Sequence, residues 1–238
     1  MRTPLPTPEP PELGERNGLA YALFLPEEPP RAGFVIAHGA GSAKESHFDF
    51  GRACRGAGLA ALAFDARGHG RSTGEFGPTA FADVIQLIDL MREHTPHVAL
   101  RGSSMGGFQV LHAAAIAEPP VDAVVAICPA TEELLLRGVH SGRLVDFRMD
   151  GDVIEPWLQS VDIRGAVASL AGRTAVMFMH AQGDEQVPYT VSEELFLIAG
   201  EPKRLLIVPG GHHRSLQHDG EMQAETIRFA QSRLSGRG

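Results

Sequence analysis

A serine lies between two glycines in the segment GSSMG, residues 102–106, which follows the pattern Gly-x-Ser-x-Gly. The segment overlaps the end of the apolar run HVALRG at 97–102 and leads into an alanine-rich, helix-forming stretch at 105–117. A serine at the tip of a sharp turn between a buried strand and a helix exposes its hydroxyl for attack on a carbonyl carbon. This context favours a nucleophilic serine over an ordinary glycine-rich turn with a surface serine.

The glycines decide which of the two adjacent serines is the nucleophile. The residues two positions before and after the nucleophile must be small, because the strand and helix backbones nearly touch there. Gly102 and Gly106 occupy these positions around Ser104, whereas an arginine and a methionine would occupy them around Ser103. We therefore predict Ser104 as the nucleophile and Ser103 as its neighbour.

A serine hydroxyl needs a base that removes its proton, and the base needs an acid that orients it. With a nucleophile of this strand–turn–helix type, the acid and the histidine follow on loops after later strands, in the order Ser, Asp, His. Asp184 follows the apolar run at 174–180, and two histidines, His212 and His213, follow the run at 204–209. Only one imidazole of this pair can face the serine, and the residue types alone do not choose between them.

Other residues compete for the acid and base roles. Glu185 is adjacent to Asp184 but follows a tight Gly-Asp turn, so its side chain is expected to point away. Asp184 itself could serve only as a turn residue, since Gly-Asp is common in turns. Glu132 and Glu133 follow the preceding predicted strand and are alternative acids, whereas His38, at a strand end, is expected to brace its loop rather than act as a base.

Backbone N–H groups are predicted to stabilise the negative charge that develops on the carbonyl oxygen. A helix beginning at Met105 would point its first amides and its positive dipole end at this oxygen, so the Met105 N–H is one expected donor. The loop HGAGS at 38–42 follows the first buried run, and its glycines would let the Ala40 N–H reach the same oxygen. His69, in another tight loop, is expected to border the site structurally.

These residues follow short apolar runs that alternate with helix-forming stretches. Each run is nearly continuously apolar, as in strands buried on both faces of a parallel sheet. The stretch at 81–92 repeats its apolar residues with the period of an amphipathic helix. The alternation predicts an α/β fold with a doubly wound, mostly parallel sheet. The runs are GFVIAH (33–38), LAALAFD (59–65), HVALRG (97–102), DAVVAI (122–127), TAVMFMH (174–180) and RLLIVP (204–209), with LAYALFL (19–25) as an additional edge strand.

One connection is longer than the others. Residues 130–172 separate two predicted strands, where roughly 15 to 20 residues would make an ordinary crossover. We predict that this insertion forms a small cap within a single domain spanning 17–238. In it, Trp157, Leu158 and Met149 are expected either to line an apolar substrate pocket or to pack in the interior of the cap.

Composition narrows the class of protein. The chain has 238 residues and a net charge of −8, which argues against binding to nucleic acid or to an anionic lipid surface. Residues 1–16 are rich in proline and predict an extended tail, without the apolar segment of a secretory signal. Apolar runs are far shorter than the roughly 20 residues of a membrane helix. With two cysteines expected as buried thiols, these features predict a cytoplasmic protein.

Metal and cofactor motifs do not occur in the sequence. Its eleven histidines form no H-E-x-x-H pattern and no paired Cys/His spacing of a zinc site. Neither a G-x-x-x-x-G-K-[ST] loop nor a G-x-G-x-x-G turn between strand and helix is present. We therefore expect chemistry that needs neither a metal nor a cofactor.

Five motifs together resemble the α/β-hydrolase fold superfamily, in its esterase and serine-aminopeptidase-like branch, over roughly residues 17 to 235. The motifs are HGAGSAKESHF at the oxyanion loop, FDARGHGRSTG, the elbow GSSMGG, HAQGDEQVP at the acid loop with Ala181 in place of the usual glycine, and PGGHHRSL. The last motif resembles P-G-x-x-H, which implies that His213 is the catalytic histidine. Small bacterial carboxylesterases and feruloyl or cinnamoyl esterases share the short insertion.

The resemblance implies a serine carboxylesterase that acts on a small-molecule ester through Ser104, His213 and Asp184. A thioesterase, a small-peptide hydrolase and an acyltransferase are compatible with the same triad. A ligand-sensing protein that keeps the fold without turnover is an alternative of another class. Dienelactone hydrolases use a cysteine nucleophile and haloalkane dehalogenases an aspartate, so Ser104 argues against both. Neither the natural acyl group nor the oligomeric state follows from the sequence.

Overall fold

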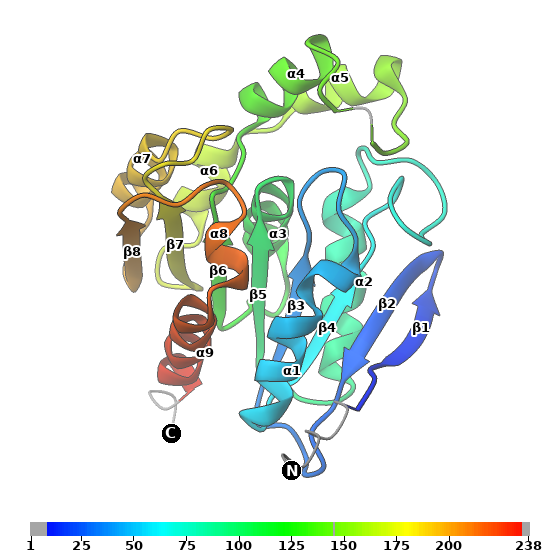
Figure 1. Ribbon diagram of the computed structural model, residues 1–238, viewed down its shortest axis with the longest axis vertical. Helices are drawn as coiled ribbons and strands as arrows, with labels where there is room; N and C mark the ends of the chain where they lie inside the picture. Colours follow the sequence, from blue (N-terminus) through cyan, green and yellow to red (C-terminus); the bar gives the residue numbers. More distant parts are fainter. Residues whose placement is uncertain (1–8, 145, 235–238) are drawn as a thin grey trace, which may run out of the picture.

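The computed structural model describes residues 9–144 and 146–234 and contains an eight-stranded sheet (Figure 1). Strands β3 to β8 run parallel to one another, and β2 pairs antiparallel with both β4 and the outermost strand β1. The spatial order is β1-β2-β4-β3-β5-β6-β7-β8. This is the predicted mostly parallel α/β sheet. Its strands are β1 (Glu12–Arg16), β2 (Leu19–Phe24), β3 (Gly33–Ala37), β4 (Ala60–Phe64), β5 (Val98–Ser103), β6 (Ala123–Ile127), β7 (Ala175–Ala181) and β8 (Lys203–Val208).

The central strands are buried at every position, which explains their continuous apolar sequences. All residues of β3, β4, β5, β6 and β7 are buried, because helices cover both faces of the sheet. The edge strand β8 is only partly buried, and its sequence accordingly begins with Lys203 and Arg204. The six apolar runs therefore form the six parallel strands, as their pattern predicts.

Helices divide between the two faces of the sheet and form two apolar cores (Figure 1). One core lies beneath α2, α3, α6 and α7, and the other beneath α1 and α9. Among the described helices, none is long and apolar enough to cross a membrane. The helices are η1 (Lys44–His47), α1 (Phe48–Gly56), α2 (Ala80–Arg92), α3 (Met105–Ile116), α4 (Glu132–His140), α5 (Gly151–Ser160), α6 (Ile163–Ser169), α7 (Thr190–Ile198), α8 (Ser215–His218) and α9 (Gly220–Leu234).

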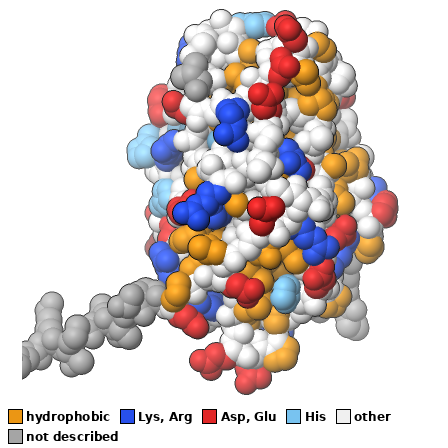
Figure 2. All heavy atoms as spheres, turned by 90° about the vertical axis from the view of Figure 1, so that its right-hand side faces the viewer, with side chains coloured by type: hydrophobic (Ala, Val, Ile, Leu, Met, Phe, Trp, Pro, Cys, Tyr) orange, Lys and Arg blue, Asp and Glu red, His pale blue; other side chains and the backbone are white. Residues whose placement is uncertain are grey.

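The N-terminal boundary differs from the prediction. Residues 12–16, assigned to the tail, form β1 and pair with β2, whereas residues 1–8 lie outside the described part. The cause is the turn Asn17-Gly18, in which both residues have positive φ, 52° and 82°. Asn-Gly is the strongest short-range signal for a two-residue hairpin turn, and it sets the register of β1 on β2. Figure 2 shows acidic and basic side chains scattered over this side of the molecule, where charges on an edge strand oppose pairing with another chain.

The long connection between β6 and β7 contains α4, α5 and α6. Helices α4 and α5 contact each other and lie above the carboxyl ends of the strands (Figure 1). Helix α6 packs instead against α3 and α7, on the face of the sheet, as an ordinary crossover helix does. The part of the insertion that covers the strand ends is therefore shorter than 130–172.

Candidate active site

Ser104 occupies a strained turn between β5 and α3. Its φ and ψ are 53° and −118°, and a non-glycine residue in this region costs about 1–3 kcal/mol, a strain found mostly at functional sites. Its N–H donates to Ile127 O at 2.9 Å, and its carbonyl accepts from Ala130 N at 3.1 Å. These bonds tie the turn to the end of β6, so the backbone around the serine is held in place.

The two flanking glycines are required by close backbone contacts. A Cβ on Gly102 would lie 2.2 Å from Gly106 O, and a Cβ on Gly106 would lie 2.2 Å from Ala37 O. Both contacts involve backbone atoms, which cannot move aside as a flexible side chain can. The spacing that singled out Ser104 in the sequence therefore has a direct steric cause.

Asp184 lies in the loop after β7, and no part of its side chain is exposed. Oδ1 accepts from the N–H groups of Gln186 and Val187, both at 2.8 Å, and Oδ2 lies 2.7 Å from His213 Nδ1. Burial by itself would raise the pKa of Asp184, but hydrogen bonds from His180, His213 and the two amides hold this pKa well below its usual range. The carboxylate is therefore charged and keeps a proton on Nδ1 of the His213 ring.

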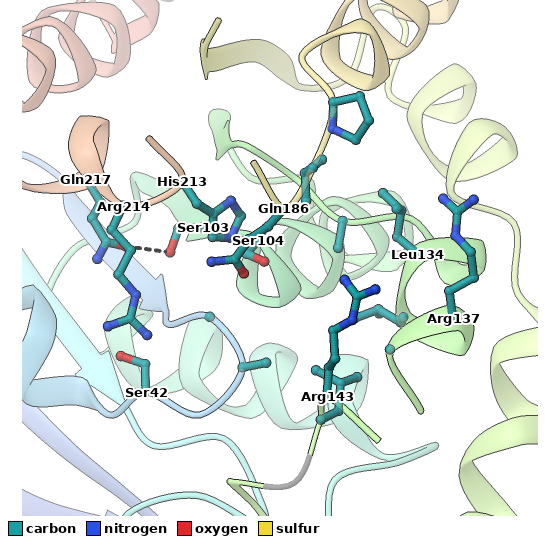
Figure 3. Close-up of a pocket in the computed structure, with 18 residues that line it drawn as sticks. Ser42, Ser103, Ser104, Leu134, Arg137, Arg143, Gln186, His213, Arg214 and Gln217 are labelled. Atoms are coloured by element: carbon teal, nitrogen blue, oxygen red, sulfur yellow. Dashed lines mark hydrogen bonds between the residues drawn. The ribbon is translucent and has the colours of Figure 1, made fainter. Parts of the chain in front are cut away.

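Of the two adjacent histidines, the structure brings His213 to Asp184. His213 also lines the same cavity as Ser104 (Figure 3). His212 is exposed; its Nδ1 accepts from Arg214 N at 3.3 Å and its N–H donates to Ser215 Oγ at 2.9 Å. The rival acid Glu185 contacts the backbone N–H of His213 at 3.2 Å and not the ring.

His180 is a site residue that the sequence reasoning did not assign. It is the penultimate residue of β7, and its Nε2 lies 3.4 Å from Asp184 Oδ2 and 3.0 Å from Val187 O. Its Nδ1 lies 2.7 Å from Ser192 Oγ in α7. His180 therefore braces the loop that carries the acid, and its place four residues before Asp184 in the HAQGD segment was the available signal.

Two histidines, His38 and His69, hold the loop after β3 through hydrogen bonds to the backbone. His38 is buried; its Nδ1 donates to Gly39 O at 2.8 Å and its Nε2 accepts from Ala66 N at 3.0 Å. His69 Nε2 accepts from Gly41 N at 3.2 Å. Burial lowers the pKa of both histidines, for His69 to about 4, which suits their neutral bracing role.

These contacts shape the loop around Ala40, which lines the cavity next to Ser104. Met105 is the first residue of α3, and the first N–H groups of a helix have no partner within the helix. Of the two amides predicted as oxyanion donors, one belongs to Met105, the residue after Ser104, and the other to Ala40, which lines the same cavity. Their role in catalysis remains a prediction.

The cavity above Ser104 has a volume of about 460 Å³ (Figure 3). Its walls combine the nucleophile turn and the loops after β3, β7 and β8 with α4 and the segment that follows it. The lining residues are Gly39, Ala40, Ser42, Ser103, Ser104, Ala130, Leu134, Leu135, Arg137, Gly138, Arg143, Leu144, Gln186, Val187, Pro188, His213, Arg214 and Gln217.

The predicted pocket residues Trp157, Leu158 and Met149 are not in this lining, so that prediction is wrong. Trp157 packs against three phenylalanines of the core, and its ring centroid lies 5.4 Å from that of Phe81 and 6.0 Å from that of Phe108. Leu158 and Met149 belong to the same apolar core. Helix α5 packs its apolar face on α2 and α3. These residues therefore pack in the interior, which is the second of the two expectations for them. Leucines of α4 and of the segment after it line the cavity instead.

Cys128, at the end of β6, lies beside the acid and the base. Its sulfur and one potential ligand atom each of Asp184 and His213 lie within 4.8 Å of one another. Burial raises the pKa of the Cys128 thiol, so it is protonated, and the two carboxylate oxygens of Asp184 already accept hydrogen bonds. This donor set fits a hydrogen-bonded acid–base pair better than a metal site.

Solved structures share this architecture, the α/β-hydrolase fold. The protein Est1E from Butyrivibrio proteoclasticus, solved with bound ferulic acid, superposes with a TM-score of 0.72 and 19% identity, over 94% of this chain and 98% of that one. A monoacylglycerol lipase from Paleococcus ferrophilus superposes with a TM-score of 0.68 and 23% identity, over 91% and 98% of the two chains. Both likenesses are in the fold.

Sequence comparison then gives the family. Residues 28–142 match the family described as serine aminopeptidase, S33. A Mycobacterium tuberculosis protein, the uncharacterized protein Rv2307c, is 30% identical over 205 residues, which cover 82% of this chain and 67% of that protein. The chain belongs to this serine aminopeptidase S33 family of α/β hydrolases.

Proposed function

We propose that this protein is a serine carboxylesterase that cleaves carboxylic esters through an acyl-enzyme on Ser104. The observation that carries the proposal is the Asp184–His213 pair, 2.7 Å apart, on the same cavity as the strained Ser104. Acid, base and nucleophile come from three separate loops at the carboxyl edge of one sheet. A hydroxyl with a base and an oriented acid is the arrangement that acyl transfer requires.

In the proposed reaction, His213 Nε2 accepts the proton of Ser104 Oγ as this oxygen attacks the ester carbonyl carbon. The amides of Ala40 and Met105 hold the resulting oxyanion; the loss of one such donor typically costs about 10²–10³ in rate. When the tetrahedral intermediate collapses, the imidazolium returns its proton to the leaving alcohol. Water then attacks the acyl-enzyme with His213 again as the base, which releases the acid and restores Ser104.

Asp184 has two roles in this sequence. Its Oδ2 accepts the Nδ1–H of His213, which leaves the unprotonated Nε2 free to serve as the base. Its negative charge then stabilises the imidazolium that forms during each attack. The low pKa of Asp184 supports this role, because the carboxylate stays charged throughout.

Ester cleavage is preferred to the other acyl transfers because of the known proteins that share the fold. One of them was solved with ferulic acid and another is a monoacylglycerol lipase, so small ester substrates are natural first candidates. The family description, serine aminopeptidase, favours a small-peptide hydrolase as the second candidate. A thioesterase and an acyltransferase would use the same residues.

A panel of p-nitrophenyl esters with short and medium acyl chains, measured beside aminoacyl p-nitroanilides, tests the reaction class. We expect turnover of the esters; turnover of the anilides alone would identify a peptidase, and turnover of neither would favour a ligand sensor. A fluorophosphonate probe should label the wild type and not Ser104→Ala. His213→Ala should abolish ester turnover, whereas the matched variant His212→Ala should retain most of it.

A further inference from the structure

Among the described residues, three arginines line the cavity above Ser104 and no acidic residue does. Arg137 belongs to α4, Arg143 follows α4, and Arg214 is next to the base His213. The chain as a whole is acidic, with 29 Asp and Glu against 21 Lys and Arg. The charged side chains that line this cavity are therefore positive, whereas the net charge of the chain is negative.

The three guanidinium groups are available to a ligand. In the described part of the chain, none of them has a hydrogen bond or an ion pair with another residue, although Arg67 and Arg164 are paired with Asp83 and Glu194. Some exposed arginines elsewhere, such as Arg52 on α1, are also unpaired. What distinguishes the three is that they share one cavity with the nucleophile.

The three arginines lie on two opposite sides of the cavity. In Figure 3, Arg143 extends from the cap side toward Gln186, with Arg137 beyond it beside Leu134. Arg214 lies on the opposite side, near Ser42 and Gln217. In Figure 3, Ser104 lies between these two sides of the cavity.

The cavity also has apolar lining residues, which are Leu134, Leu135, Leu144, Val187 and Pro188. All three arginine side chains are exposed, so water and salt screen their attraction for an anion. A guanidinium presents its N–H groups in a planar fork that matches the two oxygens of a carboxylate or phosphate. The cavity thus combines apolar lining residues with three guanidinium groups.

We propose that this cavity selects esters that carry an anionic group, a carboxylate or a phosphate, in addition to the ester bond. The inference rests on the proposed ester cleavage at Ser104 and specifies its substrate class. The anionic group lies either on the acyl part or on the alcohol part of the ester, and the two arms of the test separate these cases. The arginine on the side where the anionic group lies, Arg143 or Arg214, holds it.

Matched ester pairs test the proposal by comparing an anion with its neutral amide. Monophenyl adipate and phenyl 5-carbamoylpentanoate differ in charge on the acyl side, and 4-carboxyphenyl and 4-carbamoylphenyl butyrate differ on the alcohol side. At low ionic strength we expect kcat/KM for the anion to exceed that for the amide by about tenfold or more in one pair, the size of effect that a charge-assisted hydrogen bond gives. Added salt should reduce the ratio.

Substitutions show whether the arginines cause the preference. The ratio of anion to amide should fall by about fivefold or more in Arg143→Gln or Arg214→Gln and should recover in part in the corresponding lysine variant, which keeps the charge without the fork. Arg52→Gln, on α1, is the matched control and should keep the wild-type ratio. A wild-type ratio near one in both pairs, or a ratio that neither Arg143→Gln nor Arg214→Gln changes, would overturn the proposal.

A binding measurement separates this proposal from the proposed function. Calorimetric titration of Ser104→Ala with adipate and with adipamide needs no turnover, and we expect tighter binding of adipate that weakens in the double variant with Arg143→Gln. Ester turnover without any preference for the anion would leave the esterase and refute the anionic substrate class. Arginine-dependent binding of adipate without turnover of any ester would support the anion site and refute the esterase.

Discussion

Nδ1 of His213 lies 2.7 Å from Oδ2 of Asp184, and the Asp184 side chain is completely buried in a loop braced by His180. The orientation of the His213 imidazole is therefore a property of the fold. Two backbone amides fix Oδ1 of Asp184, and His180 lies against Oδ2.

The Asp184→Asn variant tests this relationship. An amide can offer its N–H₂ to Nδ1 and so favour the wrong tautomer, in which Nε2 carries the proton and cannot accept one from Ser104. We expect kcat to fall by about 10³–10⁴, with little change in far-UV circular dichroism. Glu185→Gln is the control and should lose less than about tenfold, because Glu185 contacts only the His213 backbone. Equal losses in the two variants would mean that Asp184 is not the orienting acid.

His112 makes stability depend on pH. Its ring stacks on Phe81 with the centroids 4.4 Å apart, and its buried Nε2 has no hydrogen-bond partner among the described residues. Burial lowers the pKa of His112 from 6.5 to about 4. The unfolded chain therefore takes up a proton as the pH falls below about 6.5 while the folded chain does not, and this contribution to stability is lost between about pH 6.5 and 4.

The substitution His112→Phe should remove this dependence and keep the stacking. We expect the difference in melting temperature between His112→Phe and the wild type to be more positive at pH 5 than at pH 7.5. Differential scanning calorimetry at both pH values measures it. His69 also has a lowered pKa, but it is present in both proteins and cancels in the difference. A difference independent of pH would show that His112 is protonated in the folded protein.

The effect of a glycine-to-alanine substitution on the free energy of unfolding should depend on the space available for the added Cβ atom. Gly106→Ala places this atom 2.2 Å from Ala37 O, and we expect the free energy of unfolding to fall by about 3 kcal/mol or more, with loss of activity. Gly56→Ala, at the end of α1, has no heavy atom within 4 Å and should be neutral or stabilising by up to about 1 kcal/mol. Urea unfolding measures both. A stable, active Gly106→Ala variant would contradict the tight turn.

Trp157 is the one tryptophan of the chain and reports on the cap. Its contacts with Phe81 of α2 and Phe108 of α3 join α5 to the helices that cover the sheet. We expect tryptophan fluorescence and far-UV circular dichroism to give the same urea midpoint, because the cap and the sheet share one apolar core. A fluorescence midpoint at lower urea would show that the cap unfolds separately.

Local features of the sequence account for most of the sheet and for the nucleophile turn. Apolar runs buried on both faces predicted the parallel strands, and the Asn17-Gly18 turn could also have revealed β1, because it encodes a hairpin locally. The pocket lining could not be predicted in this way. Trp157 and Leu134 lie on amphipathic helices of similar pattern, and only the docking of α5 onto α2 and α3 turns one toward the core while the other faces the cavity.

By itself, the sequence determined the alternation of strands and helices, the position of the strained serine turn and the order of the loops that carry Asp184 and the two histidines. These properties depend on neighbours along the chain, through side-chain periodicity and backbone sterics. Tertiary structure decided which histidine contacts Asp184, that His180 braces it, and that Arg137, Arg143 and Arg214 meet at one cavity. The physical reason is that the direction of a side chain from a loop or a helix depends on how that element packs against partners distant in sequence.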